Sequence, residues 1–275
     1  LLAAQPATAA PKKERGATPN RSNPDLAAKI GSAVDAKLKT GKVPGSAIAG
    51  GHAVHDTFTA FLPPLLPRFI ENLSLSNTAA GALSAFLQLP SLLQPVIGHI
   101  ADRRALRRIV VFAPAVTATA MSLLGWAPGY TMLALMLIVA GLSVGAFHAT
   151  APVAVGYLSG RRLGRGMGFW MVGGELGRTL GPIVVVSALG VMSLKSLAAL
   201  SLAGVATSVV LHIRLRDVPL RTRGDGEQAH WRPAVLAMRR LMLLLGSMVV
   251  LRSLMLMSVT TFLPVFLTDD GANLW

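Results

Sequence analysis

The sequence predicts an all-α membrane protein built from seven spanning helices, and three observations lead to this fold class. Hydrophobic residues make up 52% of the 275 residues and charged residues only 14%, which is too apolar for a water-soluble domain of this length. Long apolar runs recur along the chain, and a helix needs ~20 mostly apolar residues to cross the ~30 Å of bilayer hydrocarbon. Basic residues gather in alternate connections between these runs. The lipid bilayer is therefore the expected solvent of this chain.

Seven apolar runs, separated by charged or turn-forming residues, are long enough to span a bilayer. A soluble seven-helix bundle is the alternative, but most of its helices would need a polar face, and the segment 132–145 has none. The spans are expected at residues 47–70, 78–100, 109–127, 131–158, 167–190, 194–213 and 240–267.

The net charge of +14 raises nucleic acid as a partner, and the placement of the basic residues argues against it. Lys and Arg lie before the first span and after spans two, four and six, whereas the other connections hold only Arg68 and Lys195. This positive-inside pattern predicts a multi-pass protein of the cell inner (plasma) membrane with a cytoplasmic N-terminus. No basic patch interleaved with stacking aromatics remains, so no nucleic acid is expected.

The N-terminal part leads into the first six spans. Residues 1–44 are rich in Ala, Pro, Lys and Ser and are expected to form a disordered basic cytoplasmic tail. The chain opens at Leu1 and shows no basic region before a short apolar core, so no signal peptide is expected. Residues 45–213 then form the N-terminal six-helix transmembrane half. Cysteine is absent, which excludes disulfides and thiolate metal sites within the chain.

The first span carries a polar face. His52, His55, Asp56 and Thr59 share this face at three- and four-residue spacing. A carboxylate beside imidazoles can bind and release a proton, so the two histidines and Asp56 are candidates for proton coupling, and Thr59 is a substrate-cavity candidate. The alternative is a helix cap at the membrane surface, because Gly51 is close to the start of the span.

The second span ends in a charged motif. From Gly98 the sequence reads Gly-His-Ile-Ala-Asp-Arg-Arg-Ala-Leu-Arg-Arg. Gly98 permits close helix approach, and Arg103 can anchor at lipid headgroups. Asp102 can pair with Arg107 or Arg108, or face a helix N-terminus. We interpret these five residues as a conformational gate; a positive-inside loop with a helix-ending aspartate is the alternative.

The fourth span carries Gly141, Gly145, Pro152 and one ionisable residue, His148. Ionisable residues inside a span are costly and often mark a substrate or proton path, so His148 is a further proton-coupling candidate. A hydrogen-bonded interior histidine is the alternative.

Glycines recur every four residues in the fifth span. Gly173, Gly177 and Gly181 share one helix face that lets another backbone approach closely, and Pro182 permits a bend. With Gly168 they form the predicted helix-packing motif, for which generic small-residue packing without antiport is the alternative.

Glu175 and Arg178 lie well round the same helix from the glycines. Mid-span charges usually face protein or water, so Glu175 is a proton-coupling candidate and Arg178 a substrate-cavity candidate. Mutual neutralisation of the two charges is the alternative.

The end of the chain suggests a second half. Residues 214–239 are expected to be a basic cytoplasmic linker between two six-helix halves, and residues 240–275 hold the first helix of the second half. We expect five more spans beyond this truncated piece. Arg252 in the seventh span is a substrate-cavity candidate, and a counter-ion role is equally compatible with its position.

Together these motifs resemble the major facilitator superfamily. The motif from Gly98 resembles the loop-2 signature of that superfamily, with Ala105 and Leu106 in place of its Gly-Arg. The fifth-span glycines with Pro182 resemble the signature of proton-coupled drug antiporters, without its closing Gly-Gly. Further features resemble the fosmidomycin-resistance branch: the first-span His-x-x-His-Asp, Gln94-Pro95, the run 145–148 and the run 172–177.

This resemblance implies a major-facilitator-type helical bundle of twelve helices, of which the chain holds the six-helix N-terminal half plus the first helix of the second half. It implies proton-coupled antiport of a small organic compound or drug by alternating access. The expected partners are the lipid bilayer, a small-molecule substrate and protons, and we expect the complete protein to be a monomer.

Two other functions remain open. A facilitator or symporter importing a metabolite would share the fold. A membrane-embedded enzyme would use the first-span histidines and Asp56 as metal ligands or acid-base groups, but no third ligand is evident in the sequence. With no nucleotide-phosphate loop either, we expect no enzyme, no cofactor and no metal.

Overall fold

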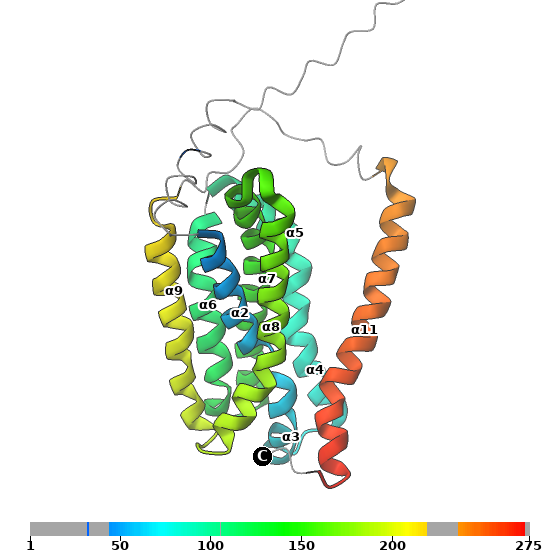
Figure 1. Ribbon diagram of the computed structural model, residues 1–275. Helices are drawn as coiled ribbons and strands as arrows, with labels where there is room; N and C mark the ends of the chain where they lie inside the picture. Colours follow the sequence, from blue (N-terminus) through cyan, green and yellow to red (C-terminus); the bar gives the residue numbers. More distant parts are fainter. Residues whose placement is uncertain (1–31, 33–43, 105, 219–235, 273–275) are drawn as a thin grey trace, which may run out of the picture.

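The computed structural model describes residues 32, 44–104, 106–218 and 236–272 (Figure 1). Within these residues all regular secondary structure is helical. The predicted tail, except for Ser32 and Pro44, and most of the predicted linker lie outside the described residues.

The described helices follow the seven predicted segments in order. The first segment is divided into two helices, the second contains a 3-10 turn, and the sixth begins with one. The bounds are α2 Pro44–Thr59, α3 Leu62–Leu73, α4 Asn77–Gln88, η1 Leu89–Leu93, α5 Gln94–Arg104, α6 Leu106–Ser122, η2 Leu124–Trp126, α7 Tyr130–Ser159, η3 Gly160–Arg162, α8 Leu163–Leu189, η4 Lys195–Leu200, α9 Ser201–Leu215 and α11 Arg239–Asp269.

Among the described residues, five helical segments are long and apolar enough to cross a membrane: Asn77–Ile100, Tyr130–Ser159, Leu163–Leu189, Lys195–Leu215 and Arg239–Asp269. The other two predicted spans are helical but shorter. The first is divided into helices of 16 and 12 residues, and α6 has 17 residues. The division follows from prolines at the start of α3, which are tolerated in a first turn but cannot continue the preceding helix.

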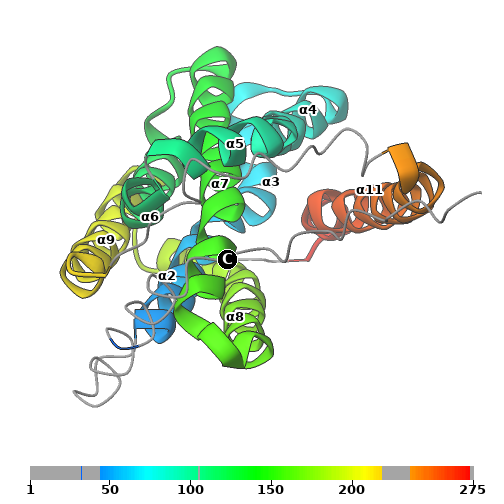
Figure 2. The same cartoon turned by 90° about the horizontal axis from the view of Figure 1, so that it is seen from above.

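The helices pack side by side, with α7 in the middle of the bundle (Figure 2). On one side of α7 lie α2 and α8, which pack against each other, and on another lies α6, which packs on α9. Towards the α3 end the core is built around Phe61, Leu65 and Leu137, and towards the other end around Ile48 and Phe147. The last helix, α11, runs beside the bundle and packs on α3 and α4 through its second half, where Val265 is buried.

The outer surface of the bundle is apolar. Large hydrophobic side chains are exposed on α5, α6, α7, α8, α9 and α11, among them Val96, Phe112, Val172, Val209 and Leu243. In water, apolar patches of this extent would favour association, whereas hydrocarbon solvates them. The structure therefore agrees with the all-α membrane class predicted from composition.

Candidate functional site

The site lies where α2 packs against α8. The glycine stripe of α8 (Gly173, Gly177 and Gly181) faces α2, and a Cβ on each glycine would overlap a backbone carbonyl of α2. The affected carbonyls are those of Ala49, Ala53 and Thr57. Because glycine has no Cβ, the two backbones approach closely and enclose the polar face of α2.

Asp56 is the centre of a buried ionisable group. Its carboxylate oxygens lie 3.0 Å from His55 Nδ1, 3.2 Å from His52 Nε2, 3.6 Å from His148 Nε2 and 3.4 Å from an Arg178 nitrogen. Asp56, His52 and His55 are 1%, 3% and 0% exposed. We call these five residues the Asp56 cluster; it joins helices α2, α7 and α8.

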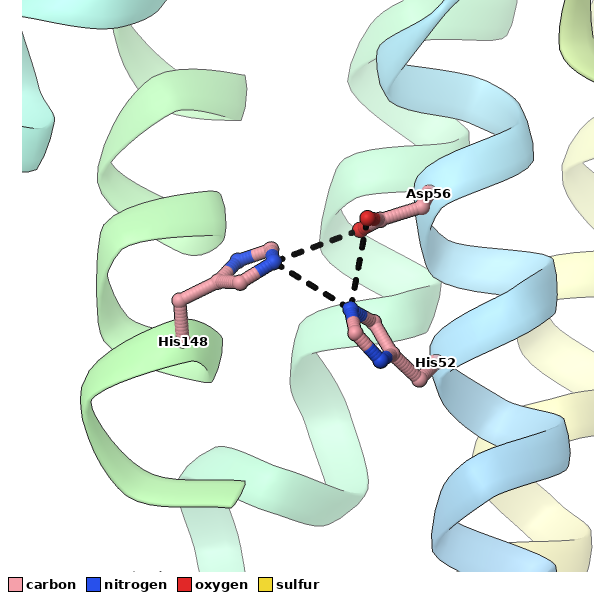
Figure 3. A group of neighbouring side chains, drawn as sticks. All are labelled: His52, Asp56 and His148. Carbon is pink, nitrogen blue, oxygen red and sulfur yellow. Dashed lines mark hydrogen bonds and ion pairs between the residues drawn. The ribbon is translucent and has the colours of Figure 1, made fainter. Parts of the chain in front are cut away.

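Figure 3 shows His52 and Asp56 of α2 and His148 of α7 pointing toward one another. His52 Nδ1 lies 2.9 Å from the Trp170 carbonyl, and His148 Nδ1 lies 3.0 Å from the Val144 carbonyl. A carbonyl only accepts hydrogen bonds, so both Nδ1 atoms carry hydrogen. The Trp170 ring also stacks on the His52 ring at a centroid distance of 3.6 Å, which holds the imidazole in place.

The two Nε2 atoms of His52 and His148 lie 3.2 Å apart, which is a hydrogen-bond distance. If both imidazoles were neutral, two lone pairs would face each other and the Asp56 carboxylate. The contact between the two Nε2 atoms is therefore attractive only when a proton or a metal ion lies between them. The ligand atoms of His52, Asp56 and His148 lie within 4.8 Å of one another, close enough to share a proton or a small metal ion. His148, a proton-coupling candidate from the sequence, is thus the third group beside His52 and Asp56, a position that the sequence did not reveal.

His55 lies deepest in the cluster. Its ring stacks on Phe147 at a centroid distance of 4.3 Å, and its Nε2 lies 3.0 Å from the Thr117 hydroxyl of α6. Complete burial of His55 argues against the alternative in which the polar face of the first span is a surface cap. Sequence reasoning missed Thr117 and Trp170. A hydroxyl inside the apolar run 109–127 was a signal for Thr117, whereas nothing in the sequence pointed to the Trp170 carbonyl.

Glu175 and Arg178 form an ion pair on α8, and both side chains are exposed, at 63% and 50%. Arg178 also reaches Asp56, so it links the exposed carboxylate to the buried one. Mutual neutralisation therefore describes only part of the arrangement. Thr59 donates its hydroxyl hydrogen to the backbone carbonyl of Asp56 at 2.8 Å, so its hydroxyl hydrogen is directed at the backbone rather than at the carboxylate.

Other predicted residues lie apart from the cluster. Arg252 is exposed on α11. This helix meets the bundle nearer its C-terminal end, where the Thr261 hydroxyl donates to Ser84 at 3.2 Å. No contact described for Arg252 joins it to Asp56. Gly168 is exposed, and among the described residues nothing lies within 4 Å of a Cβ built on it. The part of Gly168 in helix packing therefore stays a prediction.

The predicted gate is described only in part. A Cβ on Gly98 would meet Ala149 at 4.0 Å, an ordinary contact, so close helix approach does not require glycine there. Arg107 is half-buried and Arg108 exposed in the first turn of α6. The side chains of Asp102 and Arg103 lie outside what the structure describes.

The chain matches the family model of the Major Facilitator Superfamily over residues 48–275. It is 26% identical over 136 residues to an uncharacterised MFS-type transporter, YfnC, of Bacillus subtilis (strain 168), covering 48% of this chain and 33% of that protein. It is 27% identical over 139 residues to a fosmidomycin resistance protein of Escherichia coli (strain K12), covering 50% of this chain and 34% of that protein.

A solved structure of a bacterial homologue of the human lysosomal transporter Spinster, inward-facing and unoccupied, has the same fold with a TM-score of 0.65. The match has 14% sequence identity and covers 84% of this chain and 56% of that one. The chain therefore spans about a third of the curated relatives that it matches and about half of this structure. Because the family model covers most of the chain and the fold agrees, the chain belongs to the Major Facilitator Superfamily of membrane transporters.

Proposed function

We propose that this chain is part of a secondary active transporter that exports a small organic compound in exchange for protons. The observation that carries the proposal is the Asp56 cluster, in which a carboxylate that is 1% exposed contacts three imidazoles and a guanidinium. Ionisable groups inside spans are costly and are typical of ion pathways. A group of this kind can hold a proton away from bulk water.

Alternating access follows from the position of the cluster between helices. Asp56 on α2 attracts His148 on α7 and Arg178 on α8, so its charge contributes to holding three helices together. A change in the number of protons held by the cluster changes this attraction, and with it the relative free energies of arrangements in which the helices pack together or separate. Proton uptake on one side and release on the other would then bias the helices toward opposite access states, with substrate moving in the opposite direction.

Export of a drug-like compound is supported by the similarity to a fosmidomycin resistance protein, and only by that similarity. Because the relatives are about three times the length of the matched segment, the test uses the full-length protein. We would reconstitute it in proteoliposomes that enclose a pH-sensitive dye and add fosmidomycin as the probe compound. Substrate-stimulated proton movement opposite to the compound is expected, whereas movement in the same direction would favour a metabolite symporter.

Asp56→Asn should abolish probe-stimulated proton movement, because the amide removes the negative charge that holds a proton among the three imidazoles. The matched control is Glu71→Gln, which removes an exposed carboxylate at the end of α3 and should leave the movement unchanged. Removing one partner of a buried charge pair costs about 3–5 kcal/mol of stability, so Asp56→Asn can also lose transport by unfolding. Asp56→Glu is therefore a second variant, because it keeps a titratable group. Coupling that survives in Asp56→Asn would contradict the proposal. A stoichiometric metal in the purified protein would favour the enzyme alternative.

A further inference from the structure

We propose that Thr117 and Ser143 hold His55 with a hydrogen on Nε2, so that the contact between His55 and Asp56 always contains a proton. In this arrangement the proton exchanged during transport belongs to the other side of the cluster, between His52 and His148. The inference deepens the proposed function, and its role in transport rests on that function. The two hydroxyl residues are positioning residues that act through His55.

The first step is the direction of a chain of hydrogen bonds. The Ser143 hydroxyl donates to the Ala113 carbonyl at 3.1 Å, and the Thr117 hydroxyl donates to Ser143 Oγ at 2.9 Å. Each hydroxyl has one hydrogen, and this series of hydrogen bonds ends at the Ala113 carbonyl, which only accepts. Thr117 has therefore no hydrogen left for His55 Nε2, which lies 3.0 Å from its oxygen. His55 Nε2 must be the donor.

The second step concerns the other ring nitrogen. His55 Nδ1 lies 3.0 Å from Asp56 Oδ1. In a neutral imidazole whose hydrogen is on Nε2, Nδ1 carries a lone pair, which would face the lone pairs of the carboxylate. The contact is attractive only when a proton lies between the two atoms, carried either by His55 as an imidazolium or by Asp56 as an acid. The hydroxyls of Thr117 and Ser143 thus determine that the contact between His55 Nδ1 and Asp56 Oδ1 contains a proton.

The third step separates this bond from the rest of the cluster. The groups around His55 are His52 and Asp56 on its own helix, His148 on α7 and, through Asp56, Arg178 paired with Glu175 on α8. Helix α6 presents the Thr117 hydroxyl, and α9 approaches α2 with the apolar Leu211 beside Gly51.

The His55 side chain is fully buried, whereas that of His148 is 26% exposed. The contact between His52 and His148, which also needs a shared cation, is therefore the one that exchanges with water. The bond between His55 and Asp56 orients the carboxylate.

The test is nitrogen NMR on the full-length protein labelled with ¹⁵N-histidine in lipid nanodiscs, with the His55 signals assigned by comparison with His55→Gln. Nε2 should carry hydrogen at every pH from roughly 5.5 to 8.5, a range that brackets the ordinary histidine value. In Thr117→Val the acceptor is lost, so His55 should release its Nε2 hydrogen to water and keep the proton that Nδ1 shares with Asp56, leaving Nε2 unprotonated. Thr117→Ser keeps the hydroxyl and should restore the wild-type signals.

Ser143→Ala is a second variant that leaves the His55 neighbour intact. It frees the Thr117 hydrogen to turn toward Nε2, so a signal of unprotonated Nε2 should appear. An unprotonated Nε2 in the wild type, or unchanged signals in both Thr117→Val and Ser143→Ala, would overturn the proposal. The NMR result does not depend on transport: if the protein moves no protons but the signals behave as stated, the proposed function fails and the hydrogen-bond arrangement stands.

Discussion

Asp56 shows how a charge is tolerated inside an apolar bundle. An unpaired carboxylate in a medium of low dielectric constant is strongly disfavoured, and hydrogen-bonded partners reduce that cost. Here the partners are His52, His55, His148 and Arg178, which surround both carboxylate oxygens. Glu175 is in a different situation, because its side chain is 63% exposed and contacts only Arg178 among the pairs described.

Glu175→Gln should therefore affect coupling far less than Asp56→Asn. An exposed ion pair contributes about 0–1 kcal/mol, and its loss leaves Arg178 free to interact with Asp56 alone. Probe-stimulated proton movement in proteoliposomes should keep its extent and pH dependence. If Glu175→Gln abolishes the movement while Asp56→Asn preserves it, the exchanged proton depends on Glu175 rather than on the Asp56 cluster.

The pairing of α2 with α8 depends on the glycine stripe as well as on the attraction between Asp56 and Arg178. Each glycine of the stripe faces a carbonyl of α2, and Gly174 beside them contacts the His52 ring. Close backbone approach also brings Arg178 within 3.4 Å of Asp56. The spacing between these two helices therefore sets the geometry of the cluster as well as the packing.

Gly177→Ala should destabilise the protein, because the added methyl group would overlap the Ala53 carbonyl. Overpacking costs about 1–3 kcal/mol, partly offset by the roughly 0.5–1 kcal/mol that alanine gains over glycine in a helix. Gly168→Ala is the matched control in the same helix, since open space surrounds Gly168, and it should be neutral or stabilising. The thermal unfolding midpoints of the two variants in one detergent compare them; equal midpoints would contradict the packing described.

The described bundle is surrounded by exposed apolar side chains and carries basic residues at one end. In Figure 1 the start of α2, the end of α5, the connection between α7 and α8 and the end of α9 lie at the same end. Arg107 in the first turn of α6, Arg162 and Arg165 around the start of α8, and Arg214 in the last turn of α9 belong to this end. We predict that this end is cytoplasmic, because the side of the membrane whose connections carry more Lys and Arg is the cytoplasmic side.

Single cysteines can test this orientation, because the chain contains none of its own. Gly164→Cys, at the start of α8, and Asn72→Cys, at the end of α3, place exposed thiols at opposite ends of the bundle. A membrane-impermeant maleimide should label Asn72→Cys in intact cells and Gly164→Cys only after permeabilisation. The reverse labelling pattern would show that the basic end faces outward.

Much of the fold could be predicted from the sequence. The structure confirms the all-α membrane class, and the family match confirms the major-facilitator assignment. The predicted span at 47–70 is a single apolar run, but the prolines at the start of α3 divide it into two helices. The glycines at 173, 177 and 181 pack as their spacing suggests, whereas Gly168 belongs to the same motif by sequence and packs on nothing described.

Hydropathy and helical periodicity are local properties, so the sequence was sufficient for the order of the helices and for the shared face of His52, His55 and Asp56. The cluster itself depends on contacts between residues 96 and 122 positions apart, which join α2 to His148 and Arg178. Such contacts follow from which helix faces meet and how closely. Packing across the whole bundle decides which faces meet. The direction of the hydrogen bonds from Ala113 to Asp56 depends on those contacts and on the single hydrogen of each hydroxyl, so only the folded chain shows it.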